Sequence, residues 1–178
     1  MKFTKLVEMM ENVPEHLYHG TSVFHLVYIL NSNELIEGVH WDKPNEPHGP
    51  RLTKTPEIAK TFFSYATPDL GDESPGALLI LSGPKLASKY ELVEYTDTQY
   101  AGGTWEKDEE EVVVLTPVVK PLDAFLERVV VERVHAEYAL QDEILEFAIS
   151  WPYLDVGTVE EARELVQRAL SHPLVTIT

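Results

Sequence analysis

The sequence predicts a mixed α+β fold whose sheet is mainly antiparallel. Apolar runs of strand length recur through the first three quarters of the chain, at 77–82, 112–115 and 129–134 among others. The helices expected between these runs are too short and uneven to cross over between parallel strands. A chain of 178 residues, of which 44% are hydrophobic, is also long enough to bury one sizeable core. We therefore expect an α+β architecture rather than a doubly wound sheet.

Each element is predicted from its own local pattern. Strands are expected where apolar or β-branched runs lie between turn residues, at 16–21, 51–53, 77–82, 90–95, 112–115 and 129–134. Helices or helical turns are expected at 5–12, 23–30, 55–63, 84–87 and 122–126, and in two stretches after about 136. Thr21 or Ser22 is expected to cap the second helix, and Pro56 suits the first turn of the third. We expect residues 1–135 to form one domain and 136–178 a helical extension packed on it.

Composition excludes several classes of function. The chain has no cysteine, so a disulfide framework, a thiolate zinc site and a cysteine nucleophile are ruled out. The formal net charge of -16 repels a polyphosphate backbone and argues against general nucleic-acid binding, although such a charge also serves solubility alone. Residues 1–7 lack the apolar run of a signal peptide, and no stretch is long enough to span a membrane, so a cytoplasmic protein is expected.

The histidines do not suggest a metal site. His16 and His19 are three residues apart, but the expected strand and turn place them on no shared helical face. The others show no ligand spacing and are interpreted as structural; they are His25, His40, His48, His135 and His172. No metal is therefore expected.

Three short segments carry the candidate chemistry. They are Leu17-Tyr18-His19-Gly20-Thr21-Ser22, then Arg51-Leu52-Thr53 with Phe62-Phe63, then Glu109-Glu110-Glu111-Val112-Val113. In this order and spacing they resemble the ADP-ribosyltransferase family, in the His-Tyr-Glu branch that includes diphtheria toxin and the poly(ADP-ribose) polymerases. The resemblance covers residues 16–131 and implies split antiparallel sheets with short helices, and NAD as substrate. The short, acidic, cysteine-free chain is also similar to phage and bacterial members, which implies a phage-encoded protein in a host cell as a further setting.

The first segment would bind NAD. The resemblance assigns His19 to the adenosine ribose, the Gly20 backbone to the nicotinamide carboxamide, and Thr21 to the same site. A neutral imidazole can donate to or accept from a ribose hydroxyl, and glycine lets a ligand approach the main chain closely. The alternative is that His19 is a buried histidine with a structural hydrogen bond before a turn.

The second segment would form the floor of the nicotinamide site. Phe62 or Phe63 is expected to stack on the nicotinamide ring, although two adjacent phenylalanines on a short helix can equally be core residues. Where the His-Tyr-Glu branch has its tyrosine, this chain has Leu52-Thr53. Thr53 is therefore expected to contribute a hydroxyl, as in the serine-bearing branch of the family.

The third segment would supply the catalytic carboxylates. Glu111 is expected to stabilise the oxocarbenium-like ribose, and Glu109 to orient or deprotonate the acceptor. Strand alternation places Glu109 with Glu111 and Glu110 on the other side, whereas a slip of one residue would exchange these roles. The three glutamates can also be a solvated acidic loop end. In the preceding loop, Tyr100 and Trp105 occupy the position of the family's acceptor-recognition loop.

These assignments imply an NAD-dependent mono-ADP-ribosyltransferase that modifies a protein acceptor. Water as the acceptor would make the protein an NAD glycohydrolase. A catalytically silent relative would instead bind a partner protein through the acidic helical segment at the carboxyl end of the chain. An RNA phosphotransferase on the same fold needs clustered arginines for phosphate, and only Arg51 lies near the expected pocket.

Overall fold

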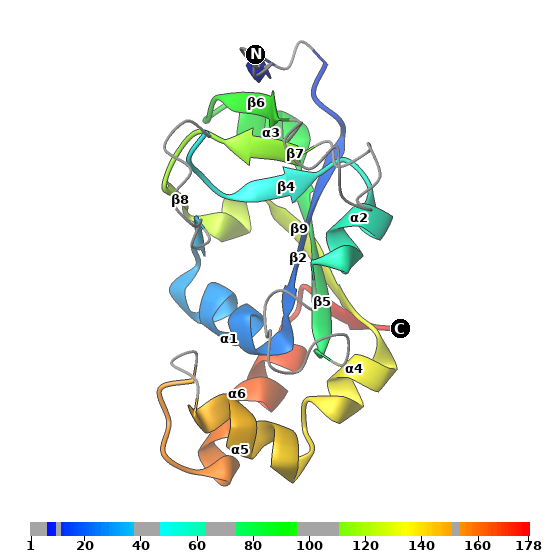
Figure 1. Ribbon diagram of the computed structural model, residues 1–178, viewed down its shortest axis with the longest axis vertical. Helices are drawn as coiled ribbons and strands as arrows, with labels where there is room; N and C mark the ends of the chain where they lie inside the picture. The colour runs from blue at the N-terminus through cyan, green and yellow to red at the C-terminus, as the bar shows by residue number, and fades with distance from the viewer. Residues whose placement is uncertain (1–6, 10–11, 38–46, 63–73, 96–110, 151–153) are drawn as a thin grey trace, which may run out of the picture.

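A computed structural model describes residues 7–9, 12–37, 47–62, 74–95, 111–150 and 154–178 (Figure 1). Its strands are β1 (Val7–Met9), β2 (His16–Ser22), β3 (Leu35–Ile36), β4 (Arg51–Thr53), β5 (Gly76–Ser82), β6 (Leu92–Tyr95), β7 (Glu111–Val114), β8 (Val118–Val119), β9 (Leu126–Val131) and β10 (Val175–Ile177). Its helices are α1 (Val23–Ser32), α2 (Pro56–Thr61), α3 (Gly83–Ala87), α4 (Arg133–Tyr138), α5 (Asp142–Ser150) and α6 (Val159–Leu170), with the 3-10 turn η4 (Leu122–Ala124).

Within these residues the strands form one eight-stranded sheet, in the order β1-β6-β7-β4-β2-β5-β9-β10, and a two-stranded sheet of β3 and β8. Every described pair is antiparallel except β9 with β10. The predicted α+β class with a mainly antiparallel sheet is therefore confirmed.

The large sheet divides into two halves between β2 and β4. Strand β2 pairs with β5 along its whole length, from His16 opposite Ser82 to Ser22 opposite Gly76. Its described pairing with β4 is limited to Tyr18 opposite Thr53. Figure 1 shows β4, β7 and β6 running across the direction of β2, β5 and β9. The two halves thus meet at one residue pair and part on either side of it.

The main core lies on the side of the sheet that α1 covers. Leu17, Leu79 and Leu81 are fully buried on one face of β2 and β5, and Phe24 and Leu26 of α1 belong to the same cluster. Burying each such side chain stabilises the fold by about 2 kcal/mol. Helix α2 lies on the other side of β2 and β5 (Figure 1). Strand β2 is therefore enclosed from both sides, which fixes the residues that it carries.

Two helix starts occur as predicted. Ser22 is the N-cap of α1, and its side chain accepts a hydrogen bond from the backbone of His25. Helix α2 begins at Pro56 after Thr55, although the Thr55 side chain makes no capping bond. Proline fits there because its fixed φ suits the first turn and its missing N–H would have no helical partner.

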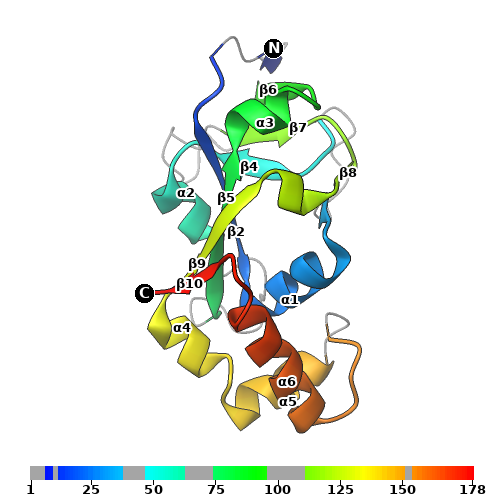
Figure 2. The same ribbon diagram turned by 180° about the vertical axis from the view of Figure 1, so that it is seen from behind.

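Two other predictions were wrong at the ends of the chain. Val7–Met9 is a strand paired with β6, not part of a helix over 5–12. Pairing with a neighbouring strand outweighs helix propensity in so short a segment. The two helices expected after residue 136 are present as α5 and α6, but the chain then returns as β10, parallel to β9 (Figure 2).

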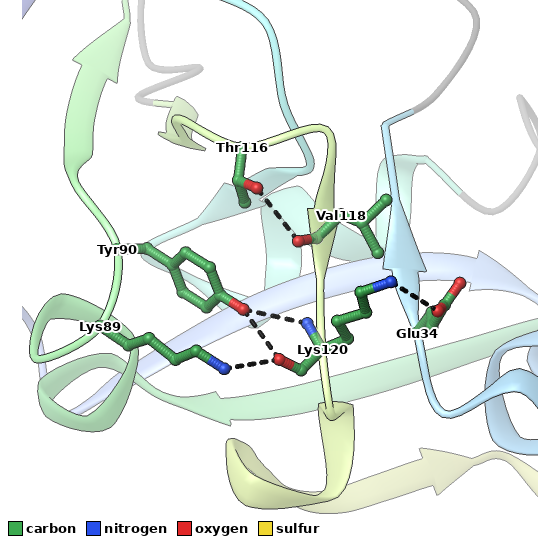
Figure 3. Close-up of polar contacts among 6 residues, drawn as sticks. All are labelled: Glu34, Lys89, Tyr90, Thr116, Val118 and Lys120. Carbon is green, nitrogen blue, oxygen red and sulfur yellow. Dashed lines mark hydrogen bonds and ion pairs between the residues drawn. The ribbon is translucent and has the colours of Figure 1, made fainter.

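A polar cluster fixes the segment between β8 and η4 (Figure 3). The Tyr90 hydroxyl donates to the carbonyl oxygen of Lys120 at 3.0 Å and accepts from the backbone N–H of Lys120 at 3.1 Å. The Lys89 ammonium donates to the same carbonyl at 2.6 Å, and the Lys120 ammonium lies 3.4 Å from a Glu34 carboxylate oxygen. These contacts tie the residues between α3 and β6 to the segment that follows β8 and, through Lys120, to Glu34 before β3.

Candidate functional site

The structure brings the three segments singled out in the sequence onto neighbouring strands. Strands β2, β4 and β7 are consecutive in the sheet. Tyr18 lies opposite Thr53, and Thr53 lies opposite Glu111 on its other side. These three residues form a row across the sheet and share one face, because directly paired residues of antiparallel strands point to the same side.

Arg51 contacts both His19 and Glu111. Its carbonyl oxygen lies 2.9 Å from Nδ1 of His19, and its guanidinium donates to the carboxylate of Glu111. Along the chain, 32 residues separate the first pair and 60 the second. The sequence places Arg51 at the start of a strand but predicts neither contact. A local pattern carries no information about an ion pair between strands that are distant in sequence.

The contact with Arg51 determines how the His19 ring can act. A carbonyl oxygen only accepts hydrogen bonds, so Nδ1 carries the proton and donates, which leaves Nε2 as an acceptor. Burial lowers the pKa of His19, and the hydrogen bond to Arg51 offsets this only in part. The ring is therefore neutral near pH 7, with Nε2 as its acceptor nitrogen.

A second buried imidazole lies at the start of α1. His25, in the first turn of α1, has its Nδ1 3.0 Å from the Ser22 hydroxyl. Burial lowers the pKa of His25 to about 4, with a smaller contribution from the charge of His19. A neutral Nδ1 can accept the Ser22 hydroxyl proton. Ser22 and His25 are three residues apart at a helix start. This spacing could have predicted the contact between their side chains.

Glu111 is a buried carboxylate at the start of an apolar strand. The residue is 8% exposed and Val112, Val113 and Val114 after it are fully buried. Alternation along β4 places the side chains of Arg51 and Thr53 on the same face, and the register brings that face alongside Glu111. A carboxylate in such surroundings needs a compensating charge, and the Arg51 guanidinium supplies it.

His19 and Glu111 reach Arg51 from two different sides. His19 follows Tyr18 and lies opposite Leu79, so alternation turns its side chain away from the face of Thr53 and Glu111, to the side that α1 covers. Its ring meets β4 just beyond the single residue pair that joins the two strands. The His19 and Glu111 side chains therefore lie on opposite faces of the sheet, next to the point where β2 and β4 part.

The remaining predicted site residues are less informative. Thr53 is buried, and its hydroxyl donates to the carbonyl oxygen of Thr55 at 2.8 Å. Gly20 and Thr21 lie in β2 opposite Leu78 and Ala77 of β5, and Phe62 is half-buried directly after α2. Five residues fall outside the described part of the chain, namely Phe63, Tyr100, Trp105, Glu109 and Glu110.

Among the residues that the structure describes, no group of three or more histidine, cysteine, aspartate or glutamate side chains could hold a metal ion. No helix in the same ranges has the length and apolar character that crossing a membrane requires.

Comparison of the chain with protein-family models, with curated proteins and with solved structures gives no match.

Proposed function

We propose that the protein cleaves the nicotinamide–ribose bond of NAD and transfers ADP-ribose to a protein acceptor. The main support is the joint contact of Arg51 with His19 and Glu111. These two residues come from distant segments. The resemblance assigns His19 to the adenosine ribose and Glu111 to the nicotinamide ribose of one NAD molecule. Their contacts with the same residue bring them near each other in the fold, which supports the proposal of a single dinucleotide site.

The chemistry assigned to the residues follows from their surroundings. Nε2 of His19 accepts a hydroxyl of the adenosine ribose, and the Glu111 carboxylate binds the nicotinamide ribose. As the bond from C1′ to the nicotinamide nitrogen breaks, its electron pair leaves with nicotinamide and positive charge develops on the ribose. A carboxylate held in a buried setting stabilises that charge more strongly than one in water. The acceptor then bonds to C1′ and loses a proton, for which Glu109 is the proposed base.

The first test is nicotinamide release from NAD by the purified protein. Wild type should release nicotinamide, and a protein lysate should increase the rate if a protein is the acceptor. Glu111→Gln should lower the rate by about 100-fold or more, since a neutral amide cannot stabilise the ribosyl cation. Equal rates with and without lysate would indicate NAD glycohydrolase activity instead.

Two variants serve as matched controls. Glu94→Gln removes a carboxylate from the adjacent strand β6, where Glu94 pairs with Lys54 at 2.8 Å, and should leave the rate unchanged. Glu110→Gln separates the two possible registers of the acidic segment. A loss of activity in Glu110→Gln with full activity in Glu111→Gln would reject the assignment of Glu111.

A catalytically silent NAD-binding protein is the second candidate. It is favoured by the engagement of the Glu111 carboxylate by Arg51 and of the Thr53 hydroxyl by Thr55. Binding of NAD by calorimetry without any nicotinamide release would select this function over the enzyme.

A further inference from the structure

The ion pair between Arg51 and Glu111 presents a conflict for the proposed reaction. The side chains are only 19% and 11% exposed, so their charges act on each other with little screening by water. Glu111 must direct its negative charge towards a ribosyl cation, yet a guanidinium against the carboxylate offsets that charge. The pair must therefore rearrange when substrate binds.

The chemistry of NAD supplies another partner for the guanidinium. A pyrophosphate joins the two riboses of NAD, and the proposed function places one ribose at His19 and the other at Glu111. The Arg51 guanidinium already lies against the Glu111 carboxylate, on the same face of the sheet, so it is within reach of a pyrophosphate attached to the ribose at Glu111. The planar fork of arginine matches two phosphate oxygens as well as it matches a carboxylate.

We propose that Arg51 is a positioning residue that exchanges partners. It pairs with Glu111 before the dinucleotide binds, and then donates to the pyrophosphate, which leaves the Glu111 carboxylate to the nicotinamide ribose. This inference rests on the proposed function and narrows its substrate class. The site takes a nicotinamide dinucleotide with an anionic pyrophosphate, and discriminates against nicotinamide nucleosides that lack one.

Charge balance favours such an exchange. A buried guanidinium without a partner is costly, and the exchange leaves it paired at both stages, while the ribosyl cation that develops beside Glu111 becomes the counter-charge of the carboxylate. The chain carries a net charge of -16, which repels an anionic ligand at long range. A local cation that gives up a carboxylate for a pyrophosphate offsets that repulsion at the site itself.

The test compares two substrates, NAD and nicotinamide riboside, in four proteins. Wild type should release nicotinamide from NAD with a kcat/KM about 100-fold above that for nicotinamide riboside. Arg51→Gln should reduce this ratio by about 10- to 100-fold, the range expected when charge-assisted hydrogen bonds are lost. Arg51→Lys keeps the charge without the fork, so it should raise KM for NAD more than it raises KM for nicotinamide riboside.

Lys54→Gln is the matched control. It removes one positive charge directly after β4, but Lys54 pairs with Glu94 rather than Glu111. The ratio of the two substrates should stay at the wild-type value. Melting temperatures of all four proteins establish that each is folded before rates are compared.

A binding measurement separates the two levels of the proposal. ADP-ribose contains the pyrophosphate but no nicotinamide, and should raise the melting temperature of wild type and Lys54→Gln but not of Arg51→Gln. If kcat/KM falls to the same extent for both substrates in folded Arg51→Gln, or falls for neither, the exchange is overturned, although nicotinamide release by wild type still supports the proposed function. No nicotinamide release by wild type would overturn the proposed function, and no stabilisation of wild type by ADP-ribose would overturn the role of Arg51.

Discussion

The guanidinium of Arg51 in β4 donates to the carboxylate of Glu111 in β7, across 60 residues of sequence. Both side chains are largely buried, and both lie on the face of the sheet that also carries Thr53. Removing one member leaves the other as an uncompensated charge, whereas replacing both with apolar residues leaves none. The stability of this part of the sheet and the chemistry proposed for it therefore depend on the same pair.

Single substitutions in the pair should be more damaging than the double substitution. Arg51→Met is expected to lower the free energy of unfolding by about 3 kcal/mol, and Arg51→Met with Glu111→Leu to recover at least about half of that loss. Urea denaturation of the single and double variants measures this coupling. Lys54→Met, at a more exposed pair, should cost less than about 1 kcal/mol. A double variant as unstable as the sum of the two singles would contradict the expectation.

Stability should fall as the pH is lowered from about 6.5 to about 4. Burial first, and the charge of His19 second, lower the pKa of His25 from 6.5 to about 4 in the folded protein. The unfolded chain therefore binds more protons in this window, so the free energy of unfolding rises with pH. The contribution of His25 alone is on the order of 3 kcal/mol.

His25→Leu tests this pH dependence, because leucine cannot titrate. Urea denaturation between pH 4 and 7 should give a shallower slope for the variant than for wild type. A variant with the wild-type slope would mean that other groups cause the loss of stability.

Gly49 should tolerate no side chain. It has a φ of +150°, and an added Cβ would lie 1.8 Å from the carbonyl oxygen of Val114. That carbonyl belongs to β7, and the N–H of Val114 donates to Pro50 directly before β4. Gly49→Ala is therefore expected to cost about 3 kcal/mol or more, by forcing β4 from β7.

Gly157→Ala is the control for Gly49→Ala, since its Cβ would have only Glu161 Oε2 nearby, at 4.0 Å. Thermal unfolding should place Gly157→Ala within about 0.5 kcal/mol of wild type. Similar losses in both variants would point to glycine replacement in general rather than to the contact with Val114.

The hydroxyl of Tyr90 should contribute measurably to stability. Tyr90→Phe removes two hydrogen bonds to the backbone of Lys120 but keeps the ring against Phe125, where the centroids are 5.6 Å apart. The expected loss is about 1–2 kcal/mol in chemical denaturation. Tyr28→Phe, at a residue that is 44% exposed, should change nothing. A Tyr90→Phe variant as stable as wild type would show that water replaces both hydrogen bonds.

Local sequence signals were sufficient for the elements that bury apolar runs or carry caps. The strands at 77–82 and 112–115 and the helix starts at Ser22 and Pro56 are examples, because each depends on residues within a few positions. Strands β1, β3, β8 and β10 were missed. Each has two or three residues and exists through its partner, so the determining information lies in the strand beside it.

The individual residues of the candidate site could be predicted from the sequence, but the contacts between them could not. His19, Thr53 and Glu111 could be chosen from short segments, and these segments do lie on adjacent strands. The role of Arg51 could not be foreseen, because it depends on a register between β4 and β7 that no short segment encodes. The opposite orientations of His19 and Thr53 likewise follow from the pairing at Tyr18.

The parallel pairing of β10 with β9 makes residues 132–174 an excursion between two neighbouring strands rather than a tail. Both ends of this excursion are anchored in the sheet: Arg133 donates to the carbonyl of Thr178, and Val129 donates to that of Leu174. Helices α4, α5 and α6 thus behave as an insert that leaves the sheet and returns beside its point of departure. A shortened protein that ends near residue 135 would lose an edge strand as well as the helices, whereas an internal replacement of the excursion could keep the sheet whole.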